Sequence, residues 1–124
     1  PKEVLKARDL LCIFETEEEV RALQPRMDLL ARQDALGIIV SAPGQSADIV
    51  SRFFAPKAGI PEDPVTGSAH CTLIPYWSKK LGKKELIASQ ASSRGGELYC
   101  TDRGDRVLLA GYATTYMEGQ IRLG

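Results

Sequence analysis

The fold of this chain is decided by the stretch Phe53-Phe54-Ala55-Pro56-Lys57-Ala58-Gly59-Ile60-Pro61-Glu62-Asp63-Pro64-Val65-Thr66-Gly67-Ser68-Ala69-His70-Cys71. It runs from an apolar strand through an acidic loop into a helix. Because a proline fixes its own φ and restricts the residue before it, Pro61 and Pro64 predict an extended loop with little freedom. The carboxylates of Glu62 and Asp63 should therefore point in fixed directions.

The same stretch predicts a helix start that can bind an anion. Gly67 permits a tight turn, and Ser68 is a good N-cap for a helix over residues 69–81. The unpaired amides of the first turn, at the positive end of the helix dipole, form a receptor for a carboxylate or an oxyanion. Asp63 would then lie beside this receptor as an acid or a base. The alternative is a helix start closed by the Ser68 and Asp63 side chains themselves.

Short apolar runs elsewhere predict a sheet. We expect short helices after Thr16 and near Met27, each with a small apolar face. The central helix is apolar on more than one face, which is typical of a buried helix. These patterns predict an α+β fold in which a curled, mostly antiparallel, barrel-like sheet surrounds a central buried helix. The expected strands are residues 10–14, 37–41, 49–54, 85–91, 97–101, 106–110, 112–117 and 120–123.

Composition indicates one globular domain over residues 1–124. Sixteen basic residues balance sixteen acidic ones, so neither nucleic acid nor a membrane surface is expected as a partner. Cys12, Cys71 and Cys100 have no metal-ligand spacing, and together with the lack of a signal peptide they favour a cytoplasmic location. Each cysteine is expected to be a small buried residue.

Four motifs, taken together and in order, resemble the phenazine biosynthesis PhzF-like family. The resemblance covers essentially all of the chain, but only the C-terminal half of the usual family member. It implies one lobe of a diaminopimelate epimerase-like fold, whose complete chains carry two similar lobes with the active site between them. The motifs are Arg52-Phe53-Phe54-Ala55-Pro56, the segment from Glu62 to His70, Pro75-Tyr76-Trp77 and Ser93-Arg94-Gly95-Gly96.

The resemblance also implies roles for individual residues. Asp63 and Ser68 match positions counted among the family's active-site residues, and the amides of Gly67 and Ala69 match its substrate-holding turn. The family's principal proton carrier is a Glu of the N-terminal lobe, where a His accompanies it, and that lobe is not part of this sequence. The resemblance implies no cofactor.

Two further residues are candidate substrate contacts. His70, the single histidine, lies two residues beyond the expected N-cap, and a partly buried helix histidine is the alternative. Arg94, beside two glycines, could bind a carboxylate with two hydrogen bonds, and a plain surface arginine is the alternative. Tyr76 and Trp77 are expected in the core rather than in a binding platform.

These observations predict a PhzF-like isomerase, or its C-terminal lobe, that moves a proton on a small carboxylated, dihydro-hydroxyanthranilate-like metabolite. The alternative is a non-catalytic half-domain that binds a small ligand or pairs with another chain. Because a lone lobe would expose the face that a second lobe covers, we expect a homodimer or a separate N-terminal lobe as partner. Residues 10–14 and 107–110 are the expected edge strands for alternative dimer seams.

Overall fold

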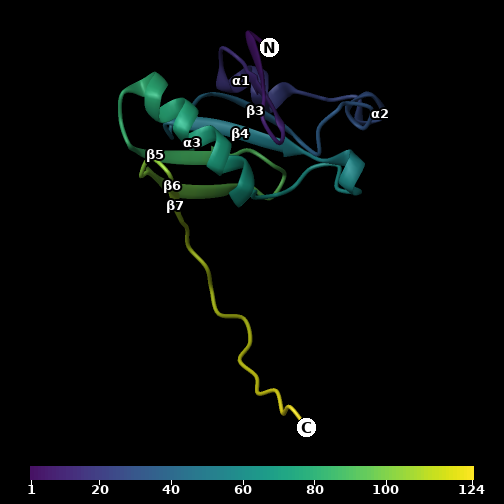
Figure 1. The fold of residues 1–124 in the computed structure, drawn as a ribbon, viewed down its shortest axis with the longest axis vertical. Coiled ribbons are helices and arrows are strands. Elements are labelled where there is room, and N and C mark those ends of the chain that lie inside the picture. Colours follow the sequence, from purple (N-terminus) through teal and green to yellow (C-terminus); the bar gives the residue numbers. More distant parts are fainter.

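The computed structural model describes all residues, 1–124, and contains one seven-stranded sheet whose strands lie side by side in sequence order (Figure 1). A long helix, α3, lies across one face of this sheet. None of the helices combines the length and the apolar composition needed to cross a lipid bilayer. The elements are β1 (Glu3–Lys6), β2 (Leu10–Ile13), α1 (Glu17–Ala22), α2 (Met27–Leu30), β3 (Ile38–Pro43), β4 (Ile49–Phe54), the 3₁₀ turn η1 (Pro56–Ala58), α3 (Gly67–Leu81), β5 (Glu85–Gln90), β6 (Gly96–Asp102) and β7 (Val107–Ala110).

The sheet is mixed. Strands β2 and β3 pair in parallel, as do β4 and β5, whereas the other four pairings are antiparallel. Parallel neighbours need a crossover connection, and the helices provide it: α1 and α2 join β2 to β3, and α3 joins β4 to β5. The expected α+β fold with a mostly antiparallel sheet is confirmed. The sheet is not closed, because β1 and β7 lie at opposite edges and do not pair, so a barrel is not confirmed.

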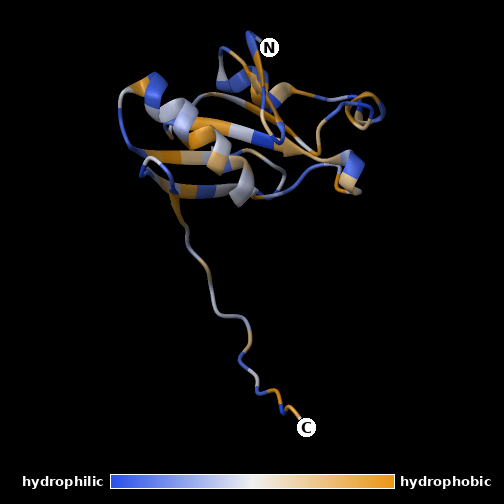
Figure 2. Ribbon diagram, viewed as in Figure 1, coloured by the Kyte–Doolittle hydropathy of each residue, from blue (hydrophilic) through white to orange (hydrophobic).

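Apolar residues gather on both faces of the sheet. The larger cluster joins α3, through Leu73, Ile74 and Trp77, to the strands beneath it. The smaller cluster joins Val20 of α1 to β3 and β4 on the other face. Figure 2 shows hydrophobic residues along the strands and hydrophilic residues in many of the connecting loops. Strands β3 and β4 are therefore buried on both sides, as their continuous apolar sequences require.

Helix α3 is less enclosed than its sequence suggests. It begins at Gly67, two residues earlier than expected, and it remains helical through Pro75. One side packs on the sheet, whereas Cys71, Pro75 and Leu81 are exposed. The sequence-based expectation of a nearly surrounded helix was wrong, because an open sheet covers one side of a helix only. Cys71 is correspondingly not the buried cysteine that was expected, whereas Cys100 is buried.

The two ends of the chain also differ from expectation. The sequence analysis placed no strand at the N-terminus, yet β1 is an edge strand, so residues 10–14 lie inside the sheet and are not a seam. No strand forms in residues 112–117 or 120–123, which continue from β7 as an extended tail directed away from the domain (Figure 1). A strand needs a neighbour for its backbone hydrogen bonds, and the backbone of this tail makes none with the rest of the chain.

Candidate active site

The acidic loop before α3 is fixed by one buried glutamine. Gln90, the last residue of β5, is 1% exposed. Its side-chain oxygen accepts from the Thr66 amide at 2.7 Å, and its nitrogen donates to the Asp63 carbonyl at 2.8 Å and to the Thr66 hydroxyl at 3.0 Å. The Asp63 amide in turn donates to the Phe53 carbonyl at 3.0 Å. These hydrogen bonds hold the loop that its prolines were expected to restrict.

Thr66, and not Ser68, is the N-cap of α3. Its hydroxyl does not cap the helix, because it donates to Asp63 Oδ2 while accepting from Gln90. Asp63 Oδ1 receives no hydrogen bond from the protein. The prediction of a Ser68 N-cap was therefore wrong: the helix begins one residue before Ser68, which places that side chain in the first turn.

The first turn of α3 is left open. The amides of Gly67, Ser68 and Ala69 donate to no protein group. Gly67 and Ser68 are exposed, whereas Ala69 lies behind them at 1% exposure. No acidic residue occupies the first helical turn. Because unpaired amides at a helix N-terminus attract negative charge, this end of α3 can accept a carboxylate.

The other loop carboxylate is already engaged. Both oxygens of Glu62 accept hydrogen bonds from Arg52, at 2.7 and 3.0 Å. The same guanidinium donates to the carbonyls of Val20 and Leu23, so this ion pair connects the loop to the end of α1. Glu62 thus anchors the loop, and Asp63 is the loop carboxylate with an unoccupied oxygen.

His70 lies beneath the helix start. It is fully buried, and its Nδ1 is 2.7 Å from the Thr66 carbonyl, so Nδ1 carries the proton. Its Nε2 has no hydrogen-bond partner. Burial lowers the pKa of His70, although the bond to Thr66 opposes this. In this structure His70 supports the loop through Thr66 and does not reach the surface.

Arg94 lies on the turn between β5 and β6. It borders a hollow of about 590 Å³ that Gly67, Gly96 and Leu109 also line, so the structure brings Arg94 and the start of α3 to one surface. The two glycines have separate roles. Gly95 adopts a φ of 71°, and a Cβ on Gly96 would lie 2.3 Å from a Val65 methyl carbon. Gly96 therefore makes room for the acidic loop.

A larger hollow, of about 720 Å³, lies at the other end of α3, against β1 and β2. Tyr76 lines it and donates to Glu3 at 2.6 Å. Burial, followed by this bond, raises the pKa of Tyr76 to about 12, so the phenol stays neutral. Trp77 lines it too but is 3% exposed and donates to Ser41. The expected core position is confirmed for Trp77, whereas Tyr76 is only half-buried.

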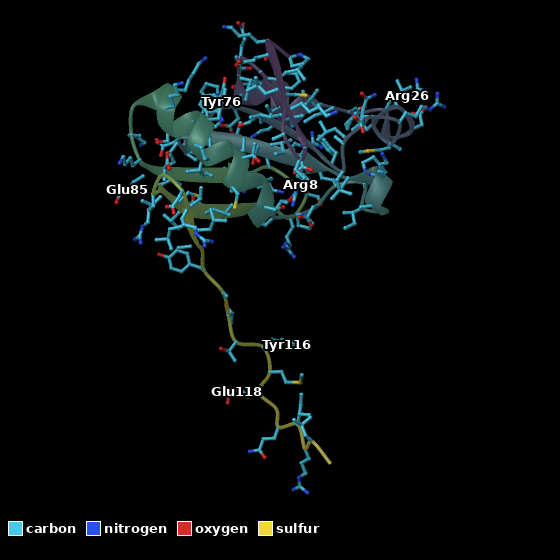
Figure 3. The ribbon with its side chains drawn as sticks, in the orientation of Figure 1. Arg8, Arg26, Tyr76, Glu85, Tyr116 and Glu118 are labelled. Atoms are coloured by element: carbon cyan, nitrogen blue, oxygen red, sulfur yellow. The ribbon has the colours of Figure 1, made fainter.

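Sequence reasoning missed two residues of the site. Gln90 and Arg8 are distant from the loop in sequence, and only the fold brings them to it. Arg8, in the turn between β1 and β2, donates to the Ser68 hydroxyl at 3.0 Å and lies by the N-terminal end of α3 (Figure 3). A polar residue ending an apolar strand was the one available signal for Gln90. No pattern singled out Arg8.

The family described as "Phenazine biosynthesis-like protein" matches residues 4–119 of this chain. The chain belongs to that family. It is 54% identical over 99% of its length to a protein named "uncharacterized isomerase" from Pseudomonas aeruginosa, covering 48% of that protein. It is 45% identical over 93% of its length to a protein of the same description from Halalkalibacterium halodurans, covering 44% of it.

A solved crystal structure is also similar to this chain. The crystal structure of a PhzC/PhzF protein from Clostridium difficile matches with a TM-score of 0.89 and 44% identity, over 99% of this chain and 48% of that one. The chain therefore spans about half the length of the relatives that it matches.

Proposed function

We propose that this chain is the C-terminal lobe of a PhzF-like isomerase that moves a proton between carbons of a small carboxylated molecule. Asp63 serves as an acid or base, and Ser68 with the amides of Gly67 and Ala69 holds the carboxylate. Arg94 faces the same surface and contributes a positive charge. The principal proton carrier, a Glu, comes from the N-terminal lobe.

The open helix start is the observation that carries this proposal. Removing a proton from carbon leaves negative charge that spreads into a conjugated carboxylate, and fixed donors lower the barrier by stabilising it. The amides at the start of α3 are such donors, and no side chain of the chain occupies them. Asp63 Oδ1 accepts no hydrogen bond from the protein, and Gln90 holds the loop that carries it.

The test is to supply the second lobe. The 124-residue chain is fused behind the N-terminal half of the Pseudomonas aeruginosa relative, and deuterium uptake from solvent into a dihydro-hydroxyanthranilate is followed by mass spectrometry. We expect exchange with the fusion and none with the chain alone. Asp63→Asn should lower the rate about 100-fold or more, the usual range for losing a positioned acid or base.

Asp34→Asn is the matched control, because the Asp34 side chain is 96% exposed and forms only a surface ion pair with Lys6. It should leave the rate unchanged. Full activity of the Asp63→Asn fusion would refute the role of Asp63. Turnover by the 124-residue chain alone would show that the missing Glu is dispensable.

A second candidate function is a non-catalytic half-domain that pairs with another chain. It is favoured by the tail, where Tyr112, Tyr116, Met117, Ile121 and Leu123 are between 80% and 98% exposed. Large apolar side chains gathered in one exposed segment are typical of an interaction surface. The partner would be a second copy or a separate N-terminal lobe, with β7 as the available edge strand.

Sedimentation over a concentration series tests this second candidate. An interface of standard size, about 1,600 Å², should hold a dimer together at high micromolar concentration. The tail substitution Tyr116→Ser/Ile121→Ser should then shift the particle toward a monomer of 13.5 kDa. A monomer at every concentration would exclude the homodimer.

A further inference from the structure

The turn between β1 and β2 brings a cation to the start of α3. Arg8 Nη2 donates to Asp9 Oδ2 at 2.9 Å and to Ser68 Oγ at 3.0 Å, and Arg8 Nε donates to Asp9 Oδ2 at 3.3 Å. Asp9 is itself fixed, because it is 1% exposed and its Oδ1 accepts from the Gly37 amide at 3.1 Å. A buried carboxylate therefore orients the guanidinium at one edge.

One terminal nitrogen of the guanidinium is open. An arginine has five N–H donors, and the contacts to Asp9 and Ser68 use only those on Nε and Nη2. The two donors on Nη1 reach no protein group, and the side chain of Arg8 is 59% exposed. Arg8 is thus held in place by a buried partner and still presents a pair of free donors next to Ser68.

The contact also fixes what Ser68 can do. A serine hydroxyl has one hydrogen to donate and can accept from others. Because Ser68 Oγ already accepts from Arg8, its own hydrogen is directed elsewhere, and no carbonyl or carboxylate of the protein receives it. Ser68 is left as a donor beside the open amides of the first turn.

We propose that Arg8 is a carboxylate-binding residue of the site at the start of α3, contacting the ligand through Nη1 and holding Ser68 Oγ so that its hydrogen faces the same ligand. The inference rests on the proposed function, since it assigns a further residue to the same site. The ligand class is a carboxylate, which can accept charge-assisted hydrogen bonds from a guanidinium nitrogen.

NMR titrations with a matched pair of probes test this. Anthranilate carries a carboxylate, and anthranilamide replaces it by a neutral amide of the same shape. In the parent chain we expect anthranilate to shift the amide resonances of residues 67–69 and to bind more tightly than anthranilamide. Arg8→Gln should weaken anthranilate binding about tenfold, the loss of one charge-assisted contact, and leave anthranilamide binding unchanged.

Arg26→Gln is the control, because Arg26 is also an exposed arginine paired with a nearby aspartate, Asp28, but lies far from the site. It should bind both probes as the parent does. If Arg8→Gln binds anthranilate like the parent, the role of Arg8 is refuted while the site stands. Equal loss of both probes would also refute it, by showing a merely structural effect.

A measurement on the unaltered chain guards against a variant that fails to fold. The Arg8 Nε–H resonance should shift when anthranilate is added, and an unchanged resonance at saturation would overturn the inference. If the parent shows no change at residues 67–69 with either probe, the carboxylate site of the proposed function fails, and this inference fails with it.

Discussion

Threonine is the N-cap residue of both α1 and α3, but only one of the two side chains caps its helix. At the start of α1, Thr16 accepts from the Glu19 amide at 3.2 Å while the Glu19 side chain accepts from the Thr16 amide, a closed capping box. At the start of α3, Thr66 turns its hydroxyl to Asp63 and leaves the helix amides free.

The first turns of the two helices also differ in charge. Helix α1 has three glutamates in its first turn, whereas α3 has no acidic residue there. Negative side chains at a helix start satisfy its dipole from within the protein. The start of α1 therefore needs no ligand. At the start of α3 the buried Gln90 holds the preceding loop instead, and the amides of the first turn stay unpaired.

Removing Gln90 should have the largest effect on stability. Gln90→Ala leaves the buried Thr66 amide and the part-buried Asp63 carbonyl without partners, and we expect a loss of about 3 kcal/mol in the free energy of unfolding. Urea denaturation measures it. Gln33→Ala, at an exposed glutamine bonded to the Leu29 carbonyl, should cost less than about 0.5 kcal/mol. Equal losses would mean that Gln90 does not hold the loop.

Adding a methyl group at Gly96, on the other side of the loop, should have the next largest effect on stability. Gly96→Ala places its Cβ against Val65 and forces the loop to move, at a cost of about 1–3 kcal/mol. The control is Gly119→Ala, where no atom lies within 4 Å. Thermal unfolding of both variants would test this, and an unchanged Gly96→Ala protein would show that the loop tolerates displacement.

Opening the closed helix start should cost less. Thr16→Ala removes the cap of α1, and we expect a loss of about 1 kcal/mol. Thr16→Ser keeps the hydroxyl and should be close to the parent. Both are measured by urea denaturation. No difference between the two variants would contradict the contribution assigned to the capping box.

At neutral pH the smallest expected effect is that of His70, which makes the free energy of unfolding depend on pH only in the acid range. Its folded pKa lies below the ordinary value of 6.5 because it is buried, so the unfolded chain binds a proton that the folded chain does not. Stability should fall as the pH drops from about 6.5 toward the folded pKa, with a slope of at most about 1.4 kcal/mol per pH unit. Above about pH 6.5 the contribution of His70 to the free energy of unfolding is constant.

His70→Gln removes this term, because His70 is the single histidine. Denaturation of parent and variant between pH 5 and 7.5 gives the difference between their stabilities, in which the shared carboxylates cancel. The stability of the parent relative to His70→Gln should fall as the pH drops below about 6.5. A difference independent of pH would show that His70 titrates alike in both states.

The sequence predicted what local patterns control. Strands β2 to β7 follow from apolar runs, and the start of α1 follows from the spacing of Thr16 and Glu19. Strand β1 was missed because its four residues are mostly exposed and include only two apolar ones, Val4 and Leu5, between charged neighbours. Gln90 and Arg8 were missed because their partners lie 24 and 60 residues away, and no local pattern connects them.

The site also depends on the register of one hairpin. Gln90 and Gly96 face each other across β5 and β6, so the residue that holds the acidic loop and the residue that makes room for it are a cross-strand pair. Successive side chains of a strand point to opposite faces, and a slip of one position would turn Gln90 away from the loop. The turn at residues 91–95 therefore acts as a spacer of fixed length, and a single-residue insertion or deletion in it would disconnect the helix start from the sheet.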